Sequence, residues 1–175
     1  MILFHRHDKK SKSAHTKSLK DLTAILEPAQ MLLDNKRKEL LDKIHVLSGL
    51  EPSRFESCCL NLVHHLIDHC QQLPETANNY YANAGGLLDY ALNRTEAALT
   101  LFREYIILET NHELSEEQKL WCYALASAGL LQGLGKLQID YQVDLFDANG
   151  QFLKAWNPLI ETMGSIGHYY DFEFL

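Results

Sequence analysis

The sequence predicts a mainly helical domain that carries one small β-hairpin. Apolar residues recur three and four positions apart over most of residues 19–131, which is the spacing of one buried helix face. Asn149-Gly150 then separates two short runs with alternating apolar residues, and this dipeptide favours a tight hairpin turn. We therefore expect a single domain over residues 19–175, with the hairpin at about residues 141–156.

The first half of this domain is expected to hold three helices. Apolar spacing predicts a short helix over residues 19–26, interrupted by Pro28, and a longer one over residues 31–47 that ends at Gly49. Ser53 and Glu56 have the spacing of a capping box, in which each side chain binds a free main-chain amide at a helix start. The helix that they open is expected to reach about Gln72, before Pro74.

Two longer helices should form the centre of the core. Gly85-Gly86 precedes a series of apolar residues over 87–107, which predicts a helix of roughly twenty residues. A second capping-box pattern, Ser115 to Gln118, opens a helix that runs to Leu131 and ends at Gly133 and Gly135.

The C-terminal part is expected to hold the hairpin, a short helix from Pro158 to Met163 and an aromatic end. Exposed aromatic clusters commonly mark interfaces, so we expect this end to contact partner proteins or a second copy of the chain. The candidate interface residues are Tyr169, Tyr170, Phe172 and Phe174.

Charge is distributed unevenly along the chain. Residues 1–20 carry six basic side chains and one acidic side chain, a net charge of +5, which leaves −12 for the rest of a chain whose total is −7. We interpret residues 1–18 as a basic, flexible tail, and the acidic body disfavours nucleic-acid binding outside it. No apolar stretch approaches the roughly 18 residues of a membrane span and nothing directs export, so we expect a cytoplasmic protein with reduced cysteines.

Two motifs suggest a family. The first runs from Leu73-Pro74 through Tyr80-Tyr81 to Gly85-Gly86-Leu87-Leu88-Asp89-Tyr90, and the second is Leu130-Leu131-Gln132-Gly133-Leu134-Gly135-Lys136. Together with Asn149-Gly150 and Trp156-Asn157-Pro158, their order resembles the TraI-like HD domain of MobH-type conjugative relaxases over roughly residues 30–175. The resemblance implies an HD-domain-like helical bundle.

The metal ligands that this family would place in the two motifs are absent. Position by position, the family's histidines fall on Tyr80, Tyr81 and Tyr90, and its His-Asp pair falls on Gln132 and Gly133. HD chemistry needs imidazole and carboxylate ligands for one or two divalent metals. We therefore expect no cofactor and no catalysis. Lys136 matches a lysine of the family, and without a metal we expect it to form an ion pair or to cap a helix end.

One other group of residues could bind a metal. His65 and His69 lie four residues apart on a predicted helix, as do His64 and Asp68, but the two pairs point in different directions and no third ligand follows. Surface histidines are the simpler interpretation. A surviving site would have to add His112 or His168 from elsewhere in the chain.

The resemblance implies a bacterial setting, because conjugative relaxases work with type IV secretion machinery. The favoured hypothesis is a non-catalytic structural or adaptor subunit of such an apparatus, which contacts other protein subunits, among them a coupling complex at the cytoplasmic face of the inner membrane. The alternative is a divergent metal-dependent phosphohydrolase or relaxase-like domain that acts on nucleic acid.

Overall fold

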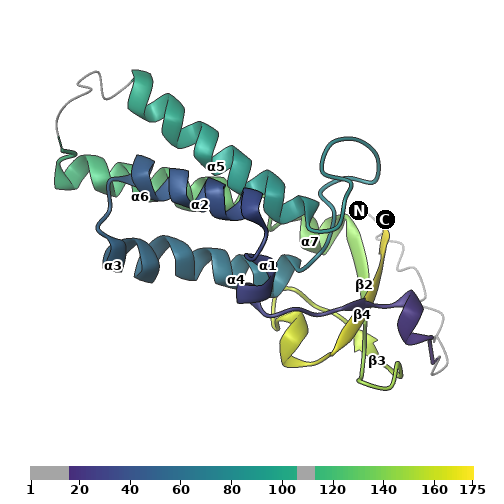
Figure 1. Ribbon diagram of the computed structural model, residues 1–175. Helices are drawn as coiled ribbons and strands as arrows, with labels where there is room; N and C mark the ends of the chain where they lie inside the picture. The colour runs from purple at the N-terminus through teal and green to yellow at the C-terminus, as the bar shows by residue number, and fades with distance from the viewer. Residues whose placement is uncertain (1–15, 106–112) are drawn as a thin grey trace, which may run out of the picture.

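The computed structural model describes residues 16–105 and 113–175, which form a helical layer and a four-stranded antiparallel sheet. The long helices lie side by side, and the sheet lies beyond one end of them (Figure 1). The prediction of a mainly helical domain is confirmed. The prediction of a single hairpin is wrong in extent, because two further strands complete the sheet.

The segment predicted as a helix over residues 19–26 is instead a 3-10 turn, η1 (Leu19–Asp21), followed by the short strand β1 (Thr23–Ala24). Side-chain amides hold this segment extended. The buried Gln71 accepts a hydrogen bond from Leu26 N at 2.9 Å and donates one to Leu26 O at 3.1 Å, and Gln72 donates to Ala24 O at 3.0 Å. These bonds satisfy main-chain groups that a helix would have satisfied internally, so tertiary contacts override the helical spacing.

The longer helix predicted over residues 31–47 divides into α1 (Pro28–Met31) and α2 (Asn35–Ser48). Asp34 starts α2, because its carboxylate accepts hydrogen bonds from the main-chain amides of Lys36 and Arg37 at 2.9 and 3.1 Å. The predicted end at Gly49 is confirmed. Gly49 has φ +65°, a left-handed conformation that glycine adopts without steric cost.

The third predicted helix is confirmed, but its start differs. It comprises α3 (Pro52–Phe55), a π-helical turn η2 (Glu56–Leu60) and α4 (Asn61–Cys70). The capping box at Ser53 and Glu56 is wrong: Glu51 is the N-cap and Pro52 takes the first helical position, where its fixed φ is favourable and its missing amide costs nothing.

The two central helices are confirmed as α5 (Gly86–Tyr105) and α6 (Glu116–Leu131). The second capping box is confirmed too, since Ser115 and Gln118 exchange hydrogen bonds of 2.9 and 3.2 Å. The two helices are antiparallel and close together at Gly129, where a Cβ atom would lie only 2.6 Å from Thr95 Oγ1. Residues 106–107 of the predicted helix lie outside the described residues. A short helix, α7 (Lys136–Ile139), leads into the sheet.

The sheet has the strand order β1-β4-β2-β3, with β2 (Tyr141–Phe146), β3 (Phe152–Ala155) and β4 (Tyr169–Phe174). The predicted hairpin is β2 and β3, and its Gly150 has φ +78°. The predicted helix from Pro158 to Met163 is wrong. Residues 158–160 form a turn instead, and Trp156 holds this turn closed by donating its indole hydrogen to Glu161 O at 3.1 Å. A 3-10 helix, η3 (Met163–Ser165), follows the turn.

The end of the predicted tail is attached to this sheet. Thr16 pairs with Gln151, and Lys17 donates its main-chain amide hydrogen to Gly150 O at 2.9 Å and forms an ion pair with Asp171. Residues 16 and 17 thus belong to the folded domain, whereas residues 1–15 lie outside the described residues.

The core joins the helices to the inner face of the sheet. Side chains from α2, α4, α5 and α6 meet Tyr141, Val143, Leu145 and Tyr170 of the strands in one hydrophobic cluster. All four cysteines are free thiols; Cys59, Cys70 and Cys122 are buried and Cys58 is half-buried. Among the described residues, no helix is both long enough and apolar enough to cross a membrane.

Candidate functional site

The two family motifs meet at the end of the helical layer that adjoins the sheet. The first motif covers the loop before α5 and the first turns of that helix, and the second covers the end of α6 and the turn into α7. Arg94 of α5 donates to Gly129 O of α6 at 3.0 Å, and a Cβ atom at Gly133 would lie 3.5 Å from the Leu87 side chain. The antiparallel packing of α5 and α6 therefore places the predicted ligand positions in one region.

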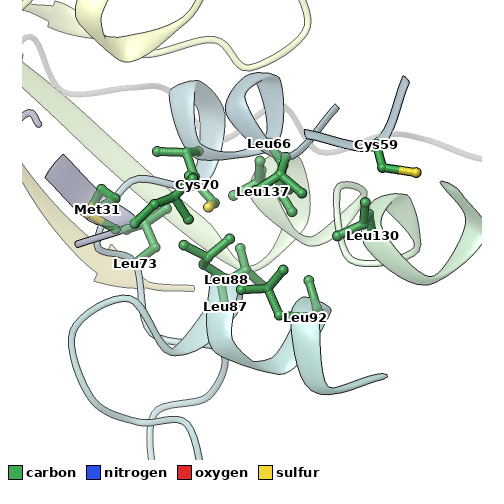
Figure 2. Close-up of a cluster of buried hydrophobic side chains, with 14 of the residues drawn as sticks. Met31, Cys59, Leu66, Cys70, Leu73, Leu87, Leu88, Leu92, Leu130 and Leu137 are labelled. Carbon is green, nitrogen blue, oxygen red and sulfur yellow. The ribbon is translucent and has the colours of Figure 1, made fainter. Parts of the chain in front are cut away.

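Four leucines of the two motifs, Leu73, Leu87, Leu88 and Leu130, point into the core, whereas Leu131 is exposed. Figure 2 shows Leu87 and Leu88 of α5, Leu130 of α6 and Leu137 of α7 converging with Leu66 and Leu73. All six are buried. Burying a leucine side chain contributes about 1.5–3 kcal/mol, so this part of the motifs stabilises the fold whether or not a metal is bound.

A glycine of the first motif is required by a close approach of two main-chain segments. A Cβ atom at Gly86 would lie 2.6 Å from the carbonyl carbon of Tyr81 and nearer still to its oxygen. That oxygen also accepts a hydrogen bond from Glu75 N at 2.8 Å. Gly86 therefore lets the loop over residues 75–85 pack against the first turn of α5.

The five predicted ligand positions have different surroundings. Tyr80 lies in the loop and is 89% exposed, and Gln132, which caps the C-terminal end of α6, is exposed as well. Tyr81 and Tyr90 are half-buried and pack edge to face, with ring centroids 5.3 Å apart, and Gly133 is half-buried. Tyr80 and Gln132 therefore face solvent, whereas Tyr81, Tyr90 and Gly133 are partly buried.

Charged side chains near the motifs bind one another. Lys136 forms an ion pair with Glu75, whose side chain is largely buried, so the predicted ion pair of Lys136 is confirmed. On the other side of the loop, Arg37 Nε of α2 donates to Asp89 Oδ1 of α5 at 2.7 Å. Tyr141 lies next to this cluster and donates its hydroxyl hydrogen to Pro74 O at 2.5 Å, and burial raises the pKa of that phenol.

An aromatic and cationic stack covers the outside of the α5 and α6 contact. The Arg94 guanidinium lies 4.8 Å from the centre of the Tyr90 ring while it donates to Gly129 O. Tyr90, one of the predicted ligand positions, is thus held by contacts with Tyr81 and Arg94.

The histidine group on α4 stays on the surface. His65 is exposed, and His69 Nδ1 is hydrogen-bonded to the main-chain oxygen of His65 at 2.9 Å, with its ring near Trp156. His64 and Asp68 are half-buried. Across residues 16–105 and 113–175, no three His, Cys, Asp or Glu side chains are grouped as metal binding would require. His168 is exposed in the turn before β4, and His112 lies outside the described residues.

The aromatic end of the chain is the strand β4, between β1 and β2, and not an exposed cluster. Tyr170 is completely buried, and its hydroxyl accepts a hydrogen bond from Gln72 N at 3.1 Å, so the prediction that it lies at an interface is wrong. Phe172 and Phe174 are half-buried and pack on Tyr141, and Tyr169 is half-buried. The signal for a strand was present, because Tyr170, Phe172 and Phe174 alternate along the sequence.

These observations agree with a comparison to known protein families. The TraI_2 family, which is described as "Putative helicase", matches residues 23–168 and thus every helix and strand of the described fold except the 3-10 turn η1 and the strand β4. The chain belongs to this family. No curated protein matches its sequence closely enough to add a more specific identity.

Proposed function

We propose that this chain is a non-catalytic structural or adaptor subunit of a bacterial type IV secretion or conjugation apparatus, built on an HD-like helical arrangement, which acts through protein contacts. One observation carries the proposal. The motifs keep Leu87, Leu88 and Leu130 in the core and Gly86 at the contact with the preceding loop, while the five predicted ligand positions hold Tyr80, Tyr81, Tyr90, Gln132 and Gly133.

None of these five side chains is suited to HD chemistry. A neutral phenol or amide is a poor ligand for a divalent metal that must lower the pKa of a bound water, and glycine has no side chain. The charged groups nearby are paired with each other, Lys136 with Glu75 and Arg37 with Asp89. They stabilise the loop before α5 and do not form an acidic cluster.

The surface supports a function in binding other proteins. Ile139, Leu159 and Ile160 are exposed, and Leu159 lines an apolar groove of about 260 Å³ between the end of α4, the α6–α7 turn and the turn after β3. Exposed apolar side chains of this kind commonly mark protein interfaces. Contact with a coupling complex would place the protein at the cytoplasmic face of the inner membrane without a membrane span of its own.

The alternative, a divergent metal-dependent phosphohydrolase or relaxase-like domain that acts on nucleic acid, draws on the family description and on the α4 histidines. Metal analysis and a phosphodiesterase assay separate the two functions. The protein is purified without chelators and assayed with added Mn²⁺, Fe²⁺, Ni²⁺ and Zn²⁺, and the H65A/H69A double variant serves as the comparison. We expect neither stoichiometric metal nor hydrolysis. Metal or activity that this double variant loses would refute the non-catalytic function.

Affinity purification from native cells, followed by mass spectrometry, tests the adaptor function directly. We expect components of a secretion or conjugation apparatus, a coupling ATPase among them, to co-purify in defined ratios. If only proteins unrelated to secretion or conjugation co-purify, the assignment is wrong even though the family membership stands.

A further inference from the structure

The exposed face of α6 lacks charge over most of its length. From Leu120 to Gly135 the sequence contains no Asp, Glu, Lys or Arg. The exposed positions recur at helical spacing opposite the buried residues Cys122, Ala126 and Leu130, and they are Leu120 (64% exposed), Trp121 (57%), Ala124, Ala128 and Leu131 (37%). The solvent face of a helix in a globular protein normally carries polar and charged residues, so this face resembles one that packs against another helix.

We propose that this face, Leu120 to Leu131 of α6, pairs with the same face of a second copy of the chain in an antiparallel arrangement around a twofold axis that passes between Ala124 and Ala128. The order of side chains is the same from either end: large at 121, small at 124 and 128, large at 131. In an antiparallel pair, Trp121 of each copy lies against Leu131 of the other, and Ala124 lies against Ala128. A twofold interface requires such self-complementarity, and two alanines at the centre let the helices approach closely.

The helix dipoles favour the antiparallel direction. Antiparallel pairing sets the negative end of each α6 helix beside the positive end of the other, whereas parallel pairing sets like ends together. The charged side chains at these ends are engaged within the chain: Glu116 pairs with Arg54 and Lys119, and Lys136 pairs with Glu75. The acidic body repels a second copy in either direction, which makes an uncharged central face the most favourable place for contact.

The expected dimer is weak because this face is small. From Leu120 to Leu131 the helix rises about 17 Å at ~1.5 Å per residue, and a strip of this length and about 10 Å wide is much smaller than a standard interface, which covers about 800 Å² per partner. We therefore expect dissociation constants in the micromolar range. This dimer goes beyond the adaptor function and does not depend on it, because it follows from the surface of α6 alone.

Sedimentation equilibrium of the full chain, at about 1 to 200 μM, tests the proposal in the range where weak dimers form. We expect the wild-type protein to dimerise reversibly. Ala124→Glu and Ala128→Glu place a carboxylate at the centre of the face and should make the protein monomeric, while far-UV circular dichroism and urea denaturation verify that both variants fold. Val46→Glu, on the exposed side of α2, is the matched control and should dimerise like the wild type.

A mixing experiment tests the direction of the two helices. Antiparallel pairing sets position 128 of one copy against position 124 of the other, so a mixture of A128E and A124K should form dimers although neither variant dimerises alone. Parallel pairing sets position 124 against itself, so dimers in a mixture of A124E and A124K, and none in the first mixture, would overturn the antiparallel geometry. A monomeric wild type at about 200 μM, or dimers that both glutamate variants leave intact, would overturn the interface itself.

Discussion

Two glycines, one from each motif, should respond in opposite ways to the same substitution. Gly86 lies where the loop over residues 75–85 meets α5, and a Cβ atom there would overlap the carbonyl group of Tyr81. Gly135 precedes α7 in a helical conformation, with φ −58° and ψ −29°, and no atom lies within 4 Å of a Cβ placed there. Gly86→Ala and Gly135→Ala therefore add the same methyl group to a closed and to an open position.

The magnitudes follow from these surroundings. Inserting a methyl group into a closed contact costs about 1–3 kcal/mol, and displacing the Tyr81 carbonyl also weakens its hydrogen bond with Glu75 N, worth about 0.5–1.5 kcal/mol. Gly86→Ala should thus lower the free energy of unfolding by about 2–4 kcal/mol, or the melting temperature by about 10 °C in a protein of this size. Gly135→Ala should leave stability unchanged or raise it by about 0.4–1 kcal/mol, because alanine has fewer unfolded conformations than glycine.

Urea denaturation at 25 °C, followed by circular dichroism and by tryptophan fluorescence, measures both variants against the wild type. The slope of the transition should stay constant, since neither substitution changes the surface exposed on unfolding. A Gly86→Ala protein within about 0.5 kcal/mol of the wild type, or a Gly135→Ala protein as destabilised as Gly86→Ala, would show that the close approach is not what fixes the loop to α5.

Three further predictions concern other contacts of the domain. Gln71→Ala removes both hydrogen bonds to Leu26 and should lower the free energy of unfolding, measured by urea denaturation, by about 2–3 kcal/mol. The control Gln132→Ala, at an exposed predicted ligand position, should lower it by less than ~0.5 kcal/mol. Equal effects of the two substitutions would show that Gln71 does not hold residues 23–26 in place. Tyr90→Ala should cost about 1–2 kcal/mol through its contacts with Tyr81 and Arg94, and Tyr80→Ala almost nothing; the reverse order would refute this assignment of packing and solvent-facing roles. Burial raises the pKa of the Cys59 thiol to about 11, so native protein at pH 8 should react quickly with a disulfide reagent at Cys58 only, and rapid modification of a second thiol would contradict it. Because a raised thiol pKa favours the neutral folded form, the stability due to Cys59 is complete below pH 9 and should fall as the pH rises toward 11.

Local patterns in the sequence predict the long helices and the hairpin of β2 and β3, but not the strands β1 and β4. The capping box at Ser115 and the glycine at position 49 act within a few residues, and the structure places both as expected. Strand β1 cannot be predicted in this way, because its conformation depends on Gln71, Gln72 and β4, which lie far away in the sequence. Strand β4 does have an alternating pattern, but the sequence does not show that β1 and β2 pair with it, so its aromatic residues also fit an exposed surface.

The site shows the same division between local and distant information. The order of the motifs is enough to predict the family. For Lys136 the sequence leaves an ion pair or a helix cap open, and the structure shows the ion pair. The order of the motifs does not predict that Tyr81 and Tyr90 face each other while Tyr80 faces solvent, because that depends on the positive φ of Tyr81, at +66°, and on the path of the loop. The sequence likewise does not predict the exposed face of α6. Apolar residues spaced three and four apart mark the buried face of a helix, but they do not show whether its opposite, uncharged face is covered by another element.

Under the proposed function, the arrangement of the motifs would let such a domain lose a metal and keep its fold. Leu73, Leu87, Leu88 and Leu130 point into the core and Gly86 permits a close contact between chain segments, whereas the predicted ligand positions lie at the end of the helical layer, in the loop and near the helix ends. Replacing a ligand there would remove a metal contact but no core side chain, and the tyrosine at position 90 has contacts with Tyr81 and Arg94. Restoring the ligands should accordingly be tolerated: a variant with Tyr90→His, Gln132→His and Gly133→Asp should remain folded, with the substitution at Tyr90 as its main cost. Unfolding of this variant would mean that the ligand positions are now part of the core, and the separation of scaffold and chemistry inferred here would fail.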